Sequence, residues 1–139
     1  MTDTLLTVLK MARGRIDAPE KWAKGAFALD AEGNAINPRY EGAVCLCAEG
    51  AIRWALWEFK QEEPNEYGEH NLTGHDAYEI KRLAYNAVWK AAHEAGVPGV
   101  DAPSEDFDYP SNFNDLDTTT HEHVLAAFDG AIAAVESQL

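Results

Sequence analysis

Basic residues are scarce in this 139-residue chain. Lysine and arginine total 11, aspartate and glutamate total 24, and the formal net charge is −13 at pH 7. The basic residues are scattered along the sequence, and an acidic surface repels phosphate backbones and anionic lipid. We therefore expect no direct binding to nucleic acid or to membranes. The acidity fits a solvated surface, and it also fits a mimic of nucleic acid or a partner for a basic protein.

Cysteine is scarce as well. The chain contains Cys45 and Cys47 and no others, and this pair cannot build a disulfide framework. Two residues two apart on a helix point about 200° apart, so these thiols do not face each other. The N-terminus has no signal-peptide pattern, and no apolar run approaches the roughly 18 residues that span a bilayer. Free thiols without an export signal predict a cytoplasmic protein.

The length and the apolar pattern predict the fold. A chain of this size predicts one domain over residues 1–139, which can fold without a metal or a disulfide. Apolar residues recur at helical spacing in four stretches. We therefore predict a mainly α protein (sparse α+β) in which about four helices pack with one short β-hairpin. The helices cover approximately residues 3–16, 43–59, 76–95 and 119–135, and the last begins with a capping-box pattern of Thr119 and Glu122.

Two connecting segments have their own character. Residues 22–36 predict the hairpin, because Phe27 and Leu29 alternate with alanines before the turn-forming tetrad Asp30–Gly33, and Ile36 follows on the return side. Residues 60–74 predict a polar surface loop. Residues 97–117 form a long acidic connection, and loops of this length in a compact domain are often functional.

The helix predicted over Ala43–Phe59 holds both cysteines. Its first turn carries Cys45 and Cys47, with Cys45 on the apolar stripe and Cys47 on a flank. Gly50 lies inside this helix, where glycine costs about 1 kcal/mol relative to alanine. That cost predicts that another stretch of backbone approaches the helix closely at Gly50.

Three blocks of the sequence occur in a familiar order. They are WAKGAFALDAEG from Trp22 to Gly33, CAEGAI from Cys47 to Ile52, and a block from Phe113 to Ile132 that begins FND. Together they resemble a small family of bacterial and phage proteins known as a domain of unknown function, with W-x-[KQ]-G-A, C-A-x-G-A and [WF]-N-D blocks. The resemblance implies a phage-related protein and no particular activity. It selects Cys47 over Cys45, and Asn114 and Asp115 from the acidic loop.

Cys47 is the candidate nucleophile. A cysteine at a helix N-terminus can have a lowered pKa, and a histidine such as His121 or His123 could act as its base, oriented by Asn114 or Asp115. The chain order departs from that of cysteine hydrolases, because the Asn–Asp pair precedes the histidines. The alternative is a small buried thiol that packs the helix.

Asn114 and Asp115 also have two interpretations. Such side chains before a helix bond nearby backbone N–H groups and fix the loop. They could instead form a polar ligand site with Trp22, Lys24 and Cys47, in which the Lys24 cation lies beside the Trp22 ring. The histidines and carboxylates fall into no standard metal-binding spacing, so we predict no metal and no cofactor.

These patterns favour a small cytoplasmic, non-catalytic binding or accessory protein for a protein or small-molecule ligand. Two alternatives are a cysteine-dependent hydrolase that uses Cys47 with a histidine, and an acidic mimic that inhibits a nucleic-acid-binding protein.

Overall fold

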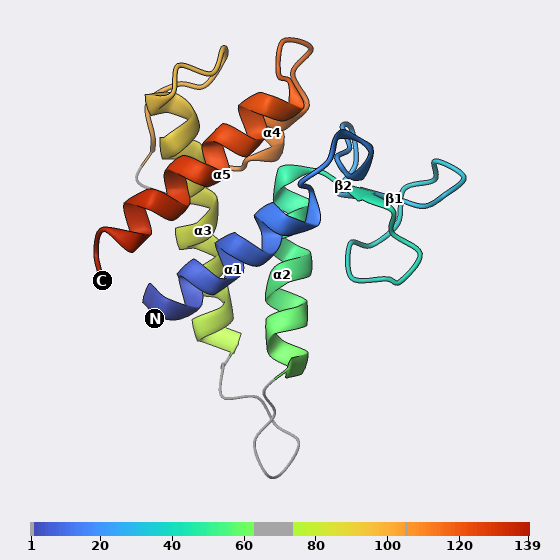
Figure 1. Cartoon of the computed structure of the whole chain (residues 1–139), viewed down its shortest axis with the longest axis horizontal. Helices are drawn as coiled ribbons and strands as arrows, with labels where there is room; N and C mark the ends of the chain where they lie inside the picture. The colour runs from blue at the N-terminus through green and yellow to red at the C-terminus, as the bar shows by residue number, and fades with distance from the viewer. Residues whose placement is uncertain (1, 63–73, 105) are drawn as a thin grey trace.

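Helices dominate the computed structural model, which describes residues 2–62, 74–104 and 106–139 (Figure 1). The predicted mainly α fold with one short antiparallel strand pair is confirmed. Residues 63–73 of the predicted 60–74 loop lie outside the described residues. The elements in chain order are α1 (Thr2–Arg15), the short 3-10 helix η1 (Pro19–Lys21), β1 (Ala28–Leu29), β2 (Cys45–Leu46), α2 (Ala48–Glu62), α3 (Gly74–Glu94), α4 (Ser111–Asn114) and α5 (His121–Glu136).

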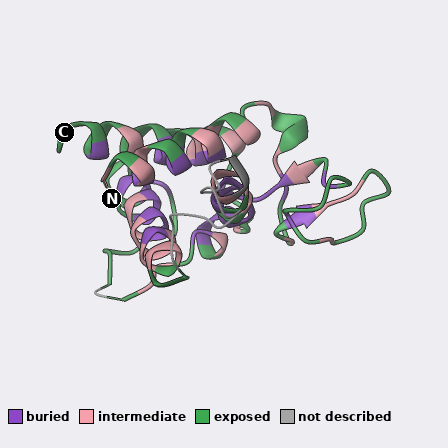
Figure 2. Cartoon of the chain, turned by 90° about the horizontal axis from the view of Figure 1, so that it is seen from below, coloured by how far each residue is buried: buried purple, intermediate pink, exposed green. Residues whose placement is uncertain are grey.

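Two pairs of helices form the body of the molecule. Helices α1 and α5 lie side by side and cross α2 and α3, which run behind them in the view of Figure 1. The strand pair and its loops extend from the end of the body where α2 begins. Figure 2 shows that the buried residues concentrate on the helix faces that meet in the middle. The start of α2 is therefore where the β segment joins the helical body.

The predicted apolar stripes form the core. Along α1, α2, α3 and α5, buried residues recur every three or four positions, which places them on one face of each helix. Burial of this apolar surface is the main term that favours folding. Buried stripe residues include Leu9, Ala12 and Ile16, then Ala51, Ile52 and Ala55, then Ile80, Ala84 and Val88, and finally Val124, Phe128 and Val135.

The second strand of the pair comes later in the chain than Ile36. Ala28 pairs with Leu46 and Leu29 pairs with Cys45, whereas the segment after the Asp30–Gly33 turn makes a single isolated bridge, Leu29 to Ala35. The turn itself forms as predicted, with Gly33 at φ 84°. β2 pairs with β1 in place of the residues after the turn. Pairing with β2 buries Leu46 completely, whereas the residues after the turn are mostly exposed.

Helix α2 begins at Ala48, so the prediction of a helix from Ala43 is wrong at its N-terminus. Cys45 lies in β2, and the Cys47 N–H donates to the Phe27 carbonyl at 3.1 Å. Strand pairing with a distant segment therefore takes up the residues that local periodicity assigns to the helix. Cys45 is half-buried and Cys47 is buried, the reverse of the predicted placement on stripe and flank.

The cap of α5 is also shifted by one residue. The Thr120 side chain accepts from the His123 N–H, and His123 Nδ1 accepts from the Thr120 N–H, which makes a capping box. The predicted cap Thr119 is buried instead, and its hydroxyl donates to the Phe113 carbonyl. The additional short helix α4 lies within the predicted 97–117 connection and ends at Asn114.

Gly50 is where the β segment touches α2. A Cβ atom added to Gly50 would lie 2.0 Å from the Phe27 carbonyl oxygen and 2.8 Å from the Phe27 carbonyl carbon. The predicted close approach of another backbone at this glycine is confirmed. Only glycine at position 50 allows this contact, because the Phe27 carbonyl is held in place by its hydrogen bond from the Cys47 N–H.

We predict that Gly50→Ala lowers the free energy of unfolding by about 2–3 kcal/mol, because the new methyl group forces the Phe27 backbone away from α2. Urea unfolding followed by circular dichroism measures the change. The matched control is Gly14→Ala in α1, where an added Cβ meets nothing within 4 Å. This control should be neutral or stabilising by up to about 1 kcal/mol. Equal stabilities for the two variants would contradict the steric explanation.

Candidate functional site

Asn114, at the end of α4, joins three separate segments through its side chain. Its Oδ1 accepts from the Trp22 indole N–H at 2.7 Å and from the Ala48 backbone N–H at 3.0 Å. Its Nδ2 donates to the Ala23 carbonyl at 3.0 Å and to Asp115 Oδ1 at 2.9 Å. A carboxamide accepts two and donates two hydrogen bonds, so the group is fully satisfied. We call this arrangement the Asn114 junction.

The neighbouring residues strengthen the same connection. Asp115 Oδ1 also accepts from the Gly25 N–H at 2.9 Å. The Lys24 Nζ donates to the Leu116 carbonyl at 2.7 Å and lies 5.5 Å from the centre of the Trp22 ring. The predicted grouping of Trp22, Lys24, Asn114 and Asp115 is therefore present as one contact network. The Trp22 N–H and the Lys24 amine are both engaged by the protein itself.

Cys47 belongs to the same site, at the position that caps α2. Its Sγ accepts from the Gly50 N–H at 3.2 Å, and the residue is 1% exposed. Burial is the main cause that raises the pKa of the Cys47 thiol to about 12, and the Asp115 and Glu49 carboxylates raise it further. At neutral pH, fewer than roughly one thiol in ten thousand is ionised. Desolvation thus outweighs the favourable effect of the helix N-terminus.

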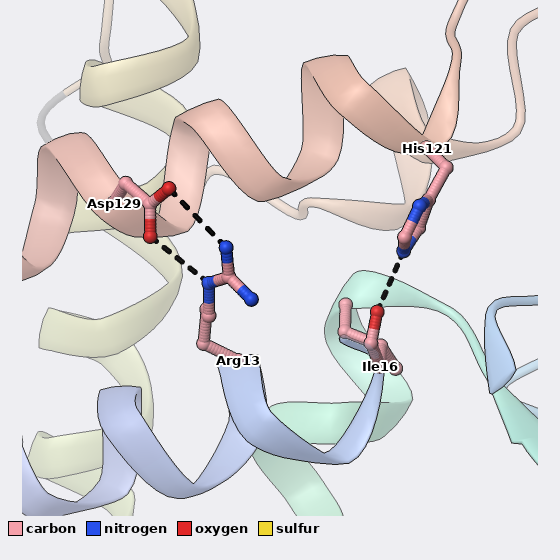
Figure 3. A network of polar contacts seen from close by, with 4 residues as sticks. All are labelled: Arg13, Ile16, His121 and Asp129. Atoms are coloured by element: carbon pink, nitrogen blue, oxygen red, sulfur yellow. Dashed lines mark hydrogen bonds and ion pairs between the residues drawn. The ribbon is translucent and has the colours of Figure 1, made fainter. Parts of the chain in front are cut away.

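His121 lies beside Trp22 of the junction and is hydrogen-bonded to a backbone carbonyl. Its Nε2 lies 2.6 Å from the Ile16 carbonyl oxygen, which can only accept, so Nε2 is the donor (Figure 3). Its ring lies 5.7 Å from the Trp22 ring. Among the described residues, no histidine nitrogen is hydrogen-bonded to Cys47 Sγ. His121 therefore ties the start of α5 to the end of α1, a task that it shares with the Arg13–Asp129 ion pair further along.

Glu49 is a site residue that sequence reasoning missed. It is 1% exposed, and one of its carboxylate oxygens accepts from the Ser111 N–H at 3.4 Å. The other oxygen lies 3.6 Å from the Arg53 guanidinium, whose Nε donates to the Tyr85 hydroxyl at 3.0 Å. Burial, with the Glu49 charge as a second cause, raises the pKa of Tyr85. The available signal was an acidic residue in the otherwise apolar Cys47–Ile52 block.

An open cavity of about 640 Å³ lies beside the junction. We call it the cysteine cleft. The Asn114 junction and the Phe27–Cys47 backbone bond hold its walls in place. Cys47 and Asp115 are the two predicted site residues that line it, and the lining also includes Phe27, Ile36, Asn37 and Ser111.

Within the described residues, no group of three or more histidine, cysteine, aspartate or glutamate side chains is arranged to hold a metal ion. No helix in the described ranges is long and apolar enough to cross a membrane.

The fold and the junction define a mainly helical protein in which a β segment is fixed to a helix N-terminus by a buried asparagine. The model for the Family of unknown function (DUF6197) matches residues 1–134, and the chain belongs to this family. The expected membership of a domain-of-unknown-function family is thereby confirmed, whereas the three motif blocks and a bacterial or phage origin stay predictions. No curated protein and no solved structure matches the chain.

We predict that Asn114→Asp lowers the free energy of unfolding by about 3 kcal/mol or more at neutral pH. The new carboxylate cannot donate to the Ala23 carbonyl, and it places a buried charge beside Asp115. The loss should shrink near about pH 4, where the introduced carboxyl is partly protonated. Chemical denaturation at both pH values measures the effect.

The matched control is Asn112→Asp, which makes the same change at an exposed position of α4. This control should stay within about 0.5 kcal/mol of the wild-type protein. An Asn114→Asp variant as stable as the control would contradict a structural role for the junction.

Proposed function

We propose that this protein is a small, non-catalytic binding protein that captures its ligand in the cysteine cleft. The observation that carries the proposal is a preorganised cavity whose lining thiol, Cys47, is buried and has a raised pKa. The junction saturates its own polar groups and leaves the neighbouring 640 Å³ open, a volume in the range of small-molecule sites. Trp22, Lys24 and Asn114 act as the frame, and Cys47 and Asp115 form part of the wall.

The cleft has mixed chemistry that suits a ligand with both polar and apolar parts. Phe27 offers an exposed aromatic ring and Ile36 a half-buried aliphatic chain. The Asp115 carboxylate is exposed, and its Oδ2 makes no hydrogen bond to a described residue. That oxygen can accept from a ligand hydroxyl or amine. A few such groups in a partly apolar cavity give orientation as well as affinity.

The contacts of Cys47 and His121 favour binding over cysteine catalysis. A nucleophilic thiol needs a base within hydrogen-bond reach and a pKa near or below neutrality. Cys47 has a raised pKa, and His121 donates to a backbone carbonyl. No observation favours the hydrolase alternative. The acidic-mimic alternative, the cytoplasmic location and the phage context stay predictions.

We predict that Cys47 resists thiol reagents in the native protein. In a Cys45→Ala variant, where Cys47 is the remaining thiol, labelling below about pH 8.5 should proceed at the rate of unfolding, because the thiol is buried and protonated. Stopped-flow labelling with and without urea measures the rates. Fast labelling with a midpoint below about pH 8.5 in the absence of urea would overturn the non-catalytic proposal.

We also predict that fragments bind the cysteine cleft and that a bulky side chain prevents it. In a fragment screen by NMR, hits should shift the amide resonances of Cys47, Ser111 and Asp115. Ala35→Trp should abolish these shifts, because Ala35 lines the cleft. Ala31→Trp is the matched control at an exposed position of the same turn and should retain them. Hits that map elsewhere, or that survive Ala35→Trp, would count against the cleft as the site.

A further inference from the structure

A second cavity, of about 620 Å³, opens between the 27–39 loop, α2 and the first turns of α3. It shares Phe27, Ile36 and Asn37 with the cysteine cleft, so the two cavities are neighbours. Its remaining lining comes mainly from the exposed side of α2 and from the facing side of α3. We call it the cationic cleft, because four basic side chains line it.

The cationic cleft gathers positive charge in a strongly acidic protein. Four of the 11 lysines and arginines line it, namely Arg39, Arg53, Lys60 and Lys81. None of its described lining residues is acidic. The net charge of the chain is −13, so random scatter would surround any cation with carboxylates. The basic residues are scattered along the sequence, and the fold brings four of them to one cavity.

Three of these cations keep their charge available. Arg53 is paired with Glu49 at 3.6 Å. Arg39, Lys60 and Lys81 have no carboxylate partner within the described part of the chain. Lys60 and Lys81 are half-buried and Arg39 is exposed. Cations that lack an internal counter-ion attract an external anion, and partial burial strengthens the attraction.

Exposed aromatic rings lie beside these cations. Trp57 is 37% exposed, and the Arg39 guanidinium lies 4.7 Å from its ring centre. Tyr78 is 54% exposed, and Lys81 Nζ lies 5.7 Å from its ring centre. The Arg53 guanidinium similarly lies 4.4 Å from the Phe27 ring. These contacts hold the cations at the cavity wall and leave ring surface for a planar ligand group to cover.

We propose that the cationic cleft binds a small aromatic anion, meaning a planar ring that carries a phosphate or a carboxylate. The ring stacks on Trp57 or Tyr78, and the anionic group pairs with Arg39, Lys60 and Lys81. The cavity volume suits a molecule of this size. This site goes beyond the proposed function, because its ligand chemistry follows from cations and rings that do not line the cysteine cleft.

Four probes separate the contributions of ring and anion. Adenosine 5′-monophosphate carries both, adenosine carries the ring alone, inorganic phosphate carries the anion alone, and indole-3-acetate replaces phosphate by carboxylate. Isothermal calorimetry at low ionic strength measures the affinity. The chain has four tryptophans, so the part of the tryptophan fluorescence change that Trp57→Phe abolishes reports the place of binding. We expect at least one ring-bearing anion to bind roughly tenfold or more tightly than adenosine and phosphate, and to weaken with added salt.

Paired variants test the cations. Arg39→Gln combined with Lys81→Gln should weaken binding of the ring-bearing anion roughly tenfold or more. Lys90→Gln is the control, because it removes one charge from the same helix as Lys81 at an exposed position outside the cleft. Trp57→Phe should remove the fluorescence change while calorimetry still detects binding. Thermal melting confirms that each variant is folded.

The outcomes separate this proposal from the previous one. Binding of adenosine 5′-monophosphate or of indole-3-acetate supports the site and identifies the anionic group. The proposal would be overturned if neither of these two probes bound, or if adenosine bound as tightly as they do. It would also be overturned if Lys90→Gln weakened their binding as much as the Arg39→Gln and Lys81→Gln pair does. Ala35→Trp, which fills the cysteine cleft, should leave the anion affinity unchanged. A loss of fragment binding alone therefore bears on the cysteine cleft, and a loss of anion binding alone bears on the cationic cleft.

Discussion

The buried Asn114 carboxamide uses its full hydrogen-bonding capacity, and its four partners are Trp22, Ala23, Ala48 and Asp115. Two of its partners lie in the segment that follows α1, one is the first N–H of α2, and one is its neighbour Asp115. An unsatisfied amide in this place would cost about 1–3 kcal/mol for each lost partner. The junction therefore holds the β segment against α2 more specifically than apolar packing could, because hydrogen bonds depend on direction as well as on distance.

The junction has a chemical consequence for the cysteine that follows the strand pair. It draws the polypeptide over the start of α2, so the Cys47 thiol is buried while its sulfur accepts the Gly50 N–H. A helix N-terminus ordinarily favours a thiolate, but burial dominates here and the pKa rises. The same arrangement leaves open space beside Cys47 and along the outer side of α2. The contacts of the Asn114 junction thus both bury the Cys47 thiol and border the open cavity beside it.

The distribution of basic residues along the sequence does not predict their distribution on the protein surface. The four basic residues of the cationic cleft are separated in the sequence by 7 to 21 positions, so no window of the chain contains a basic cluster. Two helices and one loop bring them to one cavity. The position of His121 also depends on the tertiary structure. Its sequence position is compatible with a catalytic base, but its ring nitrogen is hydrogen-bonded to the Ile16 carbonyl. Spacing along the chain could not decide either placement, because both depend on how distant elements pack.

Features that depend on local periodicity and on backbone sterics could be predicted from the amino-acid sequence. The mainly α class, the buried stripes, the turn at Asp30–Gly33 and the close approach at Gly50 all follow from patterns within one element. Trp22 and Asn114, which two of the motif blocks contain, are joined by a hydrogen bond, and Asn114 also accepts from the N–H of Ala48, the residue after Cys47. Long-range packing sets the partner of β1, the start of α2, the Thr120 cap and the role of Glu49. Each of these rests on a hydrogen bond or ion pair whose strength depends on burial, and burial is set by segments far away in the chain.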